Sequence, residues 1–232
     1  VGENNYVGLM ATDRRSSDEA NTVVGADGAF YLTPSLNVQG WLARTFTRGE
    51  GGDDLAFGVA ADYATDRWGL FARYVQIGPD AVVNSGFIQR EDLRRSDVFG
   101  RRSFRPQRLD LRKIDLYAGG NIFTGVDGTL QDFGVGPILS AEFESGDNFT
   151  VFLNWAEARP NEEFDLADTL FVPAGKYDGD VAMFMVNTSP ARPLVFNGSL
   201  QVGNFYGGTL RAGGGTLTLA PTPQVSLGFG FN

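Results

Sequence analysis

A chain of 232 residues with 31 glycines, 19 phenylalanines and only three methionines is typical of a single turn-rich β domain, because long helices favour other residue types. Its formal net charge of −9 excludes the basic surface that nucleic-acid binding requires. The absence of cysteine excludes disulfides and thiolate metal sites, and the absence of histidine excludes serine–histidine triads and histidine-based zinc hydrolases.

Segments of roughly ten residues that alternate between apolar and small or polar side chains run through the chain, as expected of half-buried strands. In chain order they cover 5–13, 22–33, 36–47, 54–64, 68–77, 95–104, 109–123, 130–143, 148–157, 180–188, 194–202, 209–220 and 225–231. This pattern predicts about twelve or thirteen strands. No run of about 18 apolar residues occurs, so no transmembrane helix is predicted.

The two faces of these segments differ in a way that favours a barrel in a membrane. In 54–64, one face carries Leu55, Phe57, Val59, Ala61 and Tyr63, and the other carries small or acidic residues. Soluble antiparallel sheets usually place lysine, glutamate and arginine on the wet face, whereas small and neutral polar residues suit a crowded barrel interior. We therefore expect the apolar face to lie against lipid.

The connections between the segments predict antiparallel neighbours. Most are short and rich in glycine, aspartate and asparagine, as in 65–67, 125–128 and 207–208. Two are long, about 78–94 and about 160–180, and we expect both to be ordered loops at one rim. The sequence thus predicts an all-β, antiparallel, up-and-down transmembrane β-barrel, with a soluble barrel or sandwich as the alternative.

Several short stretches carry a resemblance to a known family. They are 21–30 (NTVVGADGAF), Trp41, 74–90 (YVQIGPDAVVNSGFIQR), 171–177 (FVPAGKY), Arg192 and 203–208 (GNFYGG). In these stretches and their order the chain resembles the bacterial barrel domain designated domain of unknown function 5916. That family typically follows a family-9-like carbohydrate-binding domain in one exported chain.

The resemblance implies a location in the bacterial outer membrane and contact with its lipid and lipopolysaccharide. It also implies that 1–232 is a single barrel domain and a fragment, lacking an N-terminal domain and terminal strands. The barrel would then be larger than this chain, or be completed by other chains. The family supplies no established reaction.

The most uneven feature is a basic cluster within 90–113. It holds nine of the 19 cations: Arg90, Arg94, Arg95, Arg101, Arg102, Arg105, Arg108, Arg112 and Lys113. One interpretation is a selectivity lining or anion site, because arginine binds carboxylate, phosphate and sulfate groups bidentately. A second is internal ion pairing with Asp62, Asp115, Asp132 or Glu142, and a third is contact with lipopolysaccharide.

No cofactor, metal site or catalytic residue is predicted. The acidic turns have ordinary hairpin chemistry, and none has the ligand spacing of a calcium loop. A two-carboxylate hydrolase needs no histidine, but the available acids, Glu157, Glu162, Glu163 and Asp165, have no specific spacing. The aromatics that suit a membrane-interface girdle or sugar stacking are Trp41, Trp68, Trp155, Tyr74 and Tyr206.

Three functional hypotheses follow. The first is an outer-membrane barrel that acts as channel, anchor or scaffold for an exported protein, with glycan contact through a missing domain. The second is the barrel part of a carbohydrate-degrading hydrolase. The third is a soluble β-protein that binds an apolar ligand, which requires the apolar faces to point inward.

Overall fold

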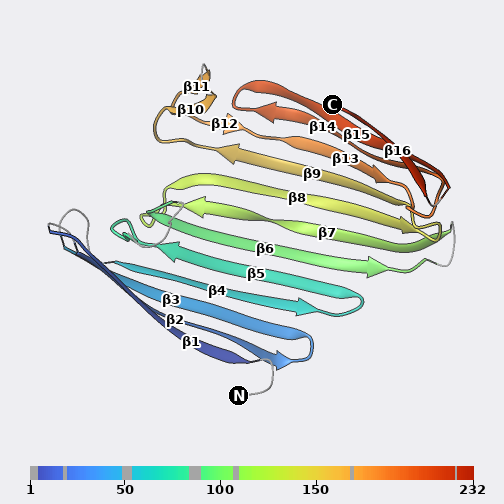
Figure 1. The fold of residues 1–232 in the computed structure, drawn as a ribbon. Coiled ribbons are helices and arrows are strands. Elements are labelled where there is room, and N and C mark those ends of the chain that lie inside the picture. The colour runs from blue at the N-terminus through green and yellow to red at the C-terminus, as the bar shows by residue number, and fades with distance from the viewer. Residues whose placement is uncertain are drawn as a thin grey trace. The chain divides into compact units, whose positions relative to one another are not determined.

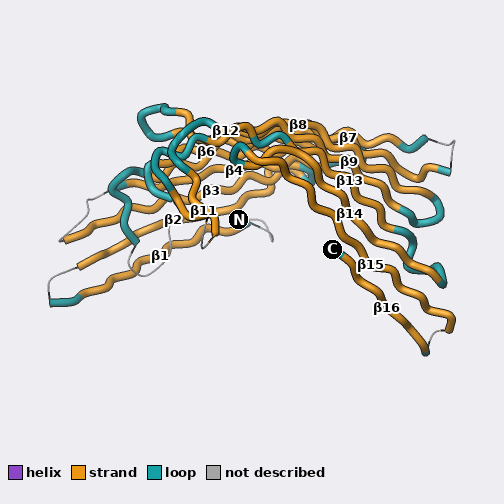
Figure 2. Tube along the Cα trace, turned by 90° about the horizontal axis from the view of Figure 1, so that it is seen from above, coloured by secondary structure: helices purple, strands orange, loops and turns teal. Residues whose placement is uncertain are grey.

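The computed structural model describes residues 5–17, 20–48, 54–83, 90–106, 110–167, 170–222 and 224–232. Across these ranges the regular structure is sixteen strands (Figure 2). The described part of the chain has no helix that is long and apolar enough to cross a membrane. The strands are β1 (Tyr6–Arg15), β2 (Ala20–Thr33), β3 (Leu36–Arg48), β4 (Leu55–Ala64), β5 (Trp68–Ile77), β6 (Leu93–Phe104), β7 (Leu111–Thr124), β8 (Leu130–Phe143), β9 (Asn148–Ala158), β10 (Phe164–Ala167), β11 (Leu170–Val172), β12 (Tyr177–Asp178), β13 (Val181–Asn187), β14 (Leu194–Phe205), β15 (Gly208–Thr222) and β16 (Val225–Phe231).

The strands follow one another in an up-and-down order (Figure 1). The hydrogen-bonded order is β1 to β9 and then β13 to β16, with β12 beside β9 and a separate ladder of β10 and β11. Chain neighbours such as β1 and β2, or β14 and β15, pair antiparallel. The prediction of an all-β, antiparallel, up-and-down sheet is therefore confirmed. Among the described residues β1 and β16 end the order, and the sheet is not closed into a barrel.

All thirteen predicted segments are strands, corresponding to β1–β9 and β13–β16. The predicted total of about twelve or thirteen was too low, because β10, β11 and β12 lie in the connection expected at 160–180. These strands have four, three and two residues, too few for period-two alternation to be visible. In the connection expected at 78–94, the described residues 78–83 and 90–92 are not strand, and 84–89 lie outside the described residues.

The chain groups into two compact units. Unit 1 comprises 1–65, 69–99 and 121–131, and unit 2 comprises 66–68, 100–120 and 132–232. The expectation of a single barrel domain stays a prediction.

In unit 1 the two faces of the strands differ sharply in exposure. On β4, Val59 is 48% exposed whereas the next residue, Ala60, is 8% exposed. The register aligns Gly40 and Tyr74 with Val59, and Gln39 and Arg73 with Ala60. Residues in register point to the same side of the sheet. We call the side that carries Val59 the apolar face and the side that carries Ala60 the polar face.

Unit 2 has the same two faces. Phe149 and Trp155 of β9 are exposed, and Val186 and Phe184 of β13 lie in register with Phe149 and Val151. Between them, Thr150 alternates to the other face. The apolar face of unit 2 is therefore the side that carries Phe149, and its polar face is the side that carries Thr150.

Little of the described chain forms a hydrophobic core. The buried hydrophobics are small or few: Val23, Ala29, Ala56, Ala60, Ala81, Leu93 and Val172. Polar groups are buried beside them, as where the Asn21 amide donates to Thr47 Oγ1 and to the Val82 carbonyl, both at 2.9 Å. The large apolar side chains are instead concentrated among the exposed residues.

Candidate functional site

The basic cluster of the sequence is divided in space by strand alternation. Along β6, Asp97 and Ser103 are almost fully buried, and Arg95 shares their side of the strand. Arg94 and Arg102 alternate to the opposite side, where Val98 and Phe104 are exposed. The arginines of β6 therefore do not form one continuous basic surface.

The most buried charge on the polar face of unit 1 is Asp97, which is 2% exposed. Its carboxylate accepts hydrogen bonds from Arg73 Nε at 2.9 Å and from the Arg95 guanidinium at 2.8 Å. The Arg95 guanidinium also lies 4.9 Å from the centroid of the Phe123 ring. Two arginines on one carboxylate leave this cluster with one net positive charge on the polar face.

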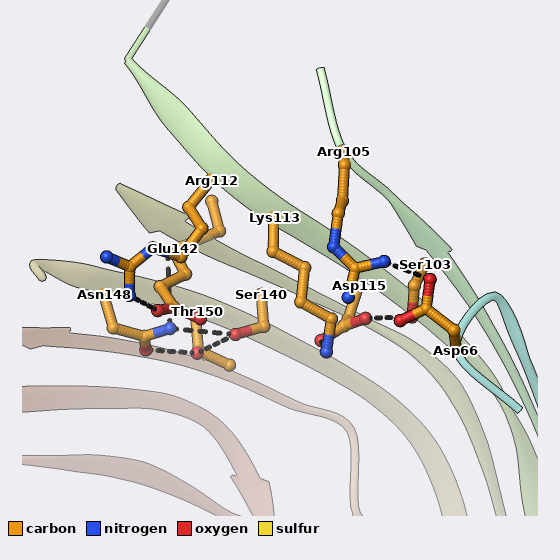
Figure 3. Close-up of polar contacts among 11 residues, drawn as sticks. Asp66, Ser103, Arg105, Arg112, Lys113, Asp115, Ser140, Glu142, Asn148 and Thr150 are labelled. Carbon is orange, nitrogen blue, oxygen red and sulfur yellow. Dashed lines mark hydrogen bonds and ion pairs between the residues drawn. The ribbon is translucent and has the colours of Figure 1, made fainter. Parts of the chain in front are cut away.

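Unit 2 holds a second group of paired charges between β6 and β7 (Figure 3). Lys113 Nζ lies 2.8 Å from Asp115, and the Ser103 hydroxyl donates to the same carboxylate at 2.5 Å. Near the end of β6, Arg105 forms an ion pair with Asp66 of the β4–β5 turn. The hydrogen bond from Arg105 holds the pKa of Asp66 below its ordinary value.

A third group of polar contacts joins the start of β7 to β8 and β9 (Figure 3). Arg112 lies 2.8 Å from Glu142 and 3.5 Å from Glu144. The Ser140 hydroxyl oxygen accepts from Asn148 Nδ2 and contacts the Thr150 hydroxyl, each at 3.1 Å. Of the four carboxylates expected to pair internally, Glu142 therefore binds an arginine, whereas Asp115 binds a lysine.

The remaining arginines of the cluster lie in different settings. The Arg102 guanidinium stacks 4.1 Å from the Trp68 ring centroid and 5.4 Å from that of Phe104, both exposed aromatics. Arg94 Nε donates to Gln76 at 3.0 Å. Arg90 is exposed before β6, Arg101 lies within β6, and Arg108 lies outside the described residues. Whether these arginines select a solute stays a prediction.

The carboxylates considered for catalysis do not form a recognisable pair. Glu157, at the end of β9, is 9% exposed and is bound by Arg159 at 2.5 Å and Lys176 at 2.7 Å. The other three, Glu162, Glu163 and Asp165, are exposed in the following connection. Glu157 thus holds that connection against β9. Within the described ranges, no group of three or more acidic side chains is placed to hold a metal ion.

The FVPAGKY and GNFYGG stretches meet in unit 2. Tyr177 of β12 lies in register with Ala158, and its hydroxyl donates to the Pro173 carbonyl at 3.0 Å. The Tyr177 ring packs edge to face on Tyr206, with centroids 5.5 Å apart. Tyr206 and Gly207 have positive φ angles of 45° and 80° in the tight β14–β15 turn. The sequence predicts only an ordered loop at about 160–180 and gives no sign of this contact between the two motifs.

In unit 2, a hydrogen bond and an ion pair join the β8–β9 turn to the β13–β14 connection. Asp147, in the β8–β9 turn, accepts from the Ser189 backbone N–H at 2.8 Å and contacts Arg192 at 2.5 Å. The backbone N–H of Ser189 makes the largest contribution to lowering the pKa of Asp147, followed by the Ser145 hydroxyl. The motif residue Arg192 therefore joins the β13–β14 connection to the preceding hairpin.

The aromatics suggested as girdle or sugar platforms divide between the faces. Trp155 lies on the apolar face of unit 2, and Tyr74 lies in register with Val59 on the apolar face of unit 1. Trp41 is different, because its register partner Gly58 belongs to the polar face beside Ala60. The alternation of the strand already carries this signal, because Trp41 lies two residues after Gln39 and therefore faces the same side.

Comparison of the chain with protein-family models, with curated proteins and with solved structures finds no match. The resemblance to domain of unknown function 5916 therefore depends on the short motifs alone and stays a prediction.

Proposed function

We propose that this chain forms part of the wall of a β-barrel in the outer membrane of a bacterium, with its apolar face against lipid and its polar face toward the lumen. The observation that supports this most directly is the exposure of the apolar face in both units, at residues such as Val59 and Trp155. A water-soluble sheet of this composition would cover that face with another layer.

The strand lengths fit a membrane crossing. A tilted transmembrane strand needs about 9–11 residues. Most strands of the sheet have at least ten, including β2, β7 and β8 with 14 and β15 with 15. The longer strands leave residues to extend past the hydrocarbon at one or both rims.

The ends of the strands carry the side chains expected at a membrane interface. Exposed aromatics lie near strand ends at Tyr63, Trp68 and Phe104. Arg102 stacks on Trp68 and Phe104, so its alkyl stem and guanidinium combine an apolar contact with a charged head. Amphipathic aromatics and long cationic side chains are favoured at this level of a bilayer.

The terminal strands β1 and β16 each have one edge that the proposal must account for. Each leaves one row of backbone N–H and C=O groups without a neighbouring strand among the described residues. Such edges are too costly in hydrocarbon, where no water satisfies them. The proposal therefore requires that strands of the same protein or of another chain complete the barrel.

The role of such a barrel would be a channel, an anchor or a scaffold for an exported domain. Paired charges such as Asp97 with Arg73 and Arg95 provide a polar lining that suits contact with water. The hydrolase hypothesis gains no support, since Glu157 is held in ion pairs and no catalytic pair is assigned.

Membrane partitioning tests the proposal. The chain, expressed behind an added bacterial export signal, should be recovered with outer membranes, resist alkaline carbonate extraction and require detergent for solubility. Folding into phospholipid vesicles should change its electrophoretic mobility between unheated and heated samples. Recovery as a folded monomer in the aqueous phase without detergent would contradict the proposal.

A conductance measurement separates channel from anchor. Protein inserted in planar bilayers should show discrete conductance steps if the lumen is open, and none if loops fill it. For an open lumen, substituting Arg95 by Gln should alter ion selectivity, whereas the matched substitution of the outward Arg94 should leave it unchanged.

A further inference from the structure

The polar face of β1 to β5 contains a hollow of about 370 Å³. We call it the Trp41 pocket, and its larger side chains are Tyr6, Asp27, Gln39, Trp41, Arg73 and Val75. These residues come from four strands, β1, β2, β3 and β5. Small-molecule sites occupy about 300–1,000 Å³, so this hollow fits a ligand of one or two rings.

A glycine creates the space for the indole. Gly58 is the register partner of Trp41. A Cβ atom added at Gly58 would lie 2.5 Å from Trp41 Nε1 and 2.9 Å from Cε2, which is too close for any real contact. The indole thus lies against the β4 backbone at Gly58, and it is 40% exposed on the polar face.

A second glycine creates the space for the carboxylate. Gly8 of β1 is in register with Asp27, which is in turn in register with Trp41. A Cβ atom at Gly8 would lie 2.5 Å from Asp27 Oδ1. Tyr6 is the register partner of Ala29, two residues from Asp27 along β2, so both side chains line the pocket beside the indole.

The opposite side of the pocket presents an amide and a guanidinium. Gln39 and Arg73 both lie in register with Ala60, whose small side chain leaves the space between them open. Arg73 is fixed from behind by its 2.9 Å contact with Asp97. The pocket therefore combines the aromatic rings of Trp41 and Tyr6 with hydrogen-bond donors and acceptors on both sides.

The charges decide which ligand class fits. Asp27 repels anions and Arg73 repels cations, so the pocket favours a neutral ligand. A carboxylate accepts hydrogen bonds, a guanidinium donates them and an amide does both, which matches hydroxyl groups that donate and accept. The exposed indole offers a flat apolar surface for the C–H face of a ring.

We propose that the Trp41 pocket binds a neutral saccharide of one or two pyranose rings, with one ring stacked on Trp41 and its hydroxyls bonded to Asp27, Gln39 and Arg73. This inference goes beyond the proposed function, and it places a ligand site on the face assigned there to the lumen.

Saturation-transfer NMR on the detergent-solubilised protein tests it, because that method detects weak binding and identifies the ligand protons near the protein. Maltose and cellobiose serve as neutral probes, and glucuronate and glucosamine as charged counterparts. Transfer should saturate with the neutral disaccharides and be strongest at ring C–H protons. The charged sugars should bind at least about threefold more weakly.

Four variants localise the binding. Trp41→Ala removes the indole, and Gly58→Ala displaces it. Each should weaken binding by about tenfold, the equivalent of ~1.4 kcal/mol. Asp27→Asn should weaken it by a smaller factor. Gly100→Ala is the matched glycine control, because a Cβ there meets nothing closer than 3.8 Å, and its binding should be unchanged.

Folding of each variant is checked by circular dichroism, and Trp41→Phe, which keeps a ring, replaces Trp41→Ala if the latter does not fold. Absence of transfer at about 50 mM disaccharide, or equal affinity in Gly58→Ala and the unaltered protein, would overturn the inference. Saccharide binding by a protein that partitions into water would refute the membrane proposal alone. Membrane insertion without saccharide transfer would refute this inference alone.

Discussion

A charged side chain in the middle of the apolar face distinguishes lipid from water as the neighbour of that face. Val59 lies near the middle of β4, is 48% exposed and faces the same side as Tyr74 and Leu42. If water covers this face, the Val59→Arg guanidinium reaches solvent and the free energy of unfolding changes by no more than about 0.5 kcal/mol.

If lipid covers the face, the same substitution is costly. Arginine on the lipid side of a membrane barrel costs about 2–4 kcal/mol at the bilayer midplane and about 0–1 kcal/mol near the interface. The unfolding equilibrium constant of Val59→Arg should therefore increase by roughly 30- to 900-fold in phospholipid vesicles, at 1.36 kcal/mol per tenfold.

The matched control is Tyr63→Arg, on the same strand and face but one residue from its end. Four residues separate the two positions, which is about 13 Å along the strand. Denaturant unfolding in vesicles, followed by tryptophan emission, gives both free energies. If Val59→Arg leaves the free energy of unfolding unchanged, or if Tyr63→Arg lowers it by the same amount, the assignment of this face to lipid is refuted.

Three further predictions concern the polar contacts. Asp97→Asn should lower the unfolding free energy by about 2 kcal/mol, because it leaves two arginines without their buried carboxylate. The lowered pKa of Asp147 means that its carboxylate stabilises the fold above the ordinary aspartate pKa and that this contribution is lost as the pH falls through the lowered value. Acid should therefore lower the melting temperature more in the unaltered protein than in Asp147→Asn, measured at pH 7 and near pH 3. Glu157→Gln should speed tryptic cleavage after Lys176, since that lysine loses its 2.7 Å ion pair.

Each of these has a control. Asp66→Asn removes a carboxylate from an exposed pair and should cost no more than about 1 kcal/mol, so equal effects at Asp66 and Asp97 would contradict the burial argument. If the melting temperatures of Asp147→Asn and the unaltered protein fall equally with pH, Asp147 does not stabilise the contact between the two turns. Glu163→Gln, in the same connection as Lys176, should leave cleavage unchanged, and faster cleavage in both variants would remove the role of Glu157.

The main strands were predictable because alternation is a local property of a pleated chain. The pattern at 54–64 identified β4 and its two faces, and the exposure of Val59 against Ala60 agrees with that division. The same local reasoning did not find β12, because two residues cannot display a period. Instead, β12 pairs with Ala158, nineteen residues earlier in the chain, and the preceding Lys176 binds Glu157 of β9.

The basic cluster illustrates why the candidate site was harder to predict than the fold. Adjacent residues in a strand point to opposite sides, so Arg94 and Arg95 contact different neighbours, Gln76 and Asp97. A cluster defined along the sequence was therefore not a cluster in space. The Trp41 pocket is the reverse case, since its walls are far apart in the chain and the strand register brings them together.

By itself, the sequence determined the thirteen longer strands, their antiparallel order and the identity of the apolar face, since these follow from side-chain alternation and short turns. Only the tertiary structure decided which side chains meet across strands. Register is a pairing between distant segments, and a slip by one residue would move Trp41 away from Gly58 and Asp97 away from Arg73. Those pairings decide which charges are neutralised and where a ligand fits, and no local pattern encodes them.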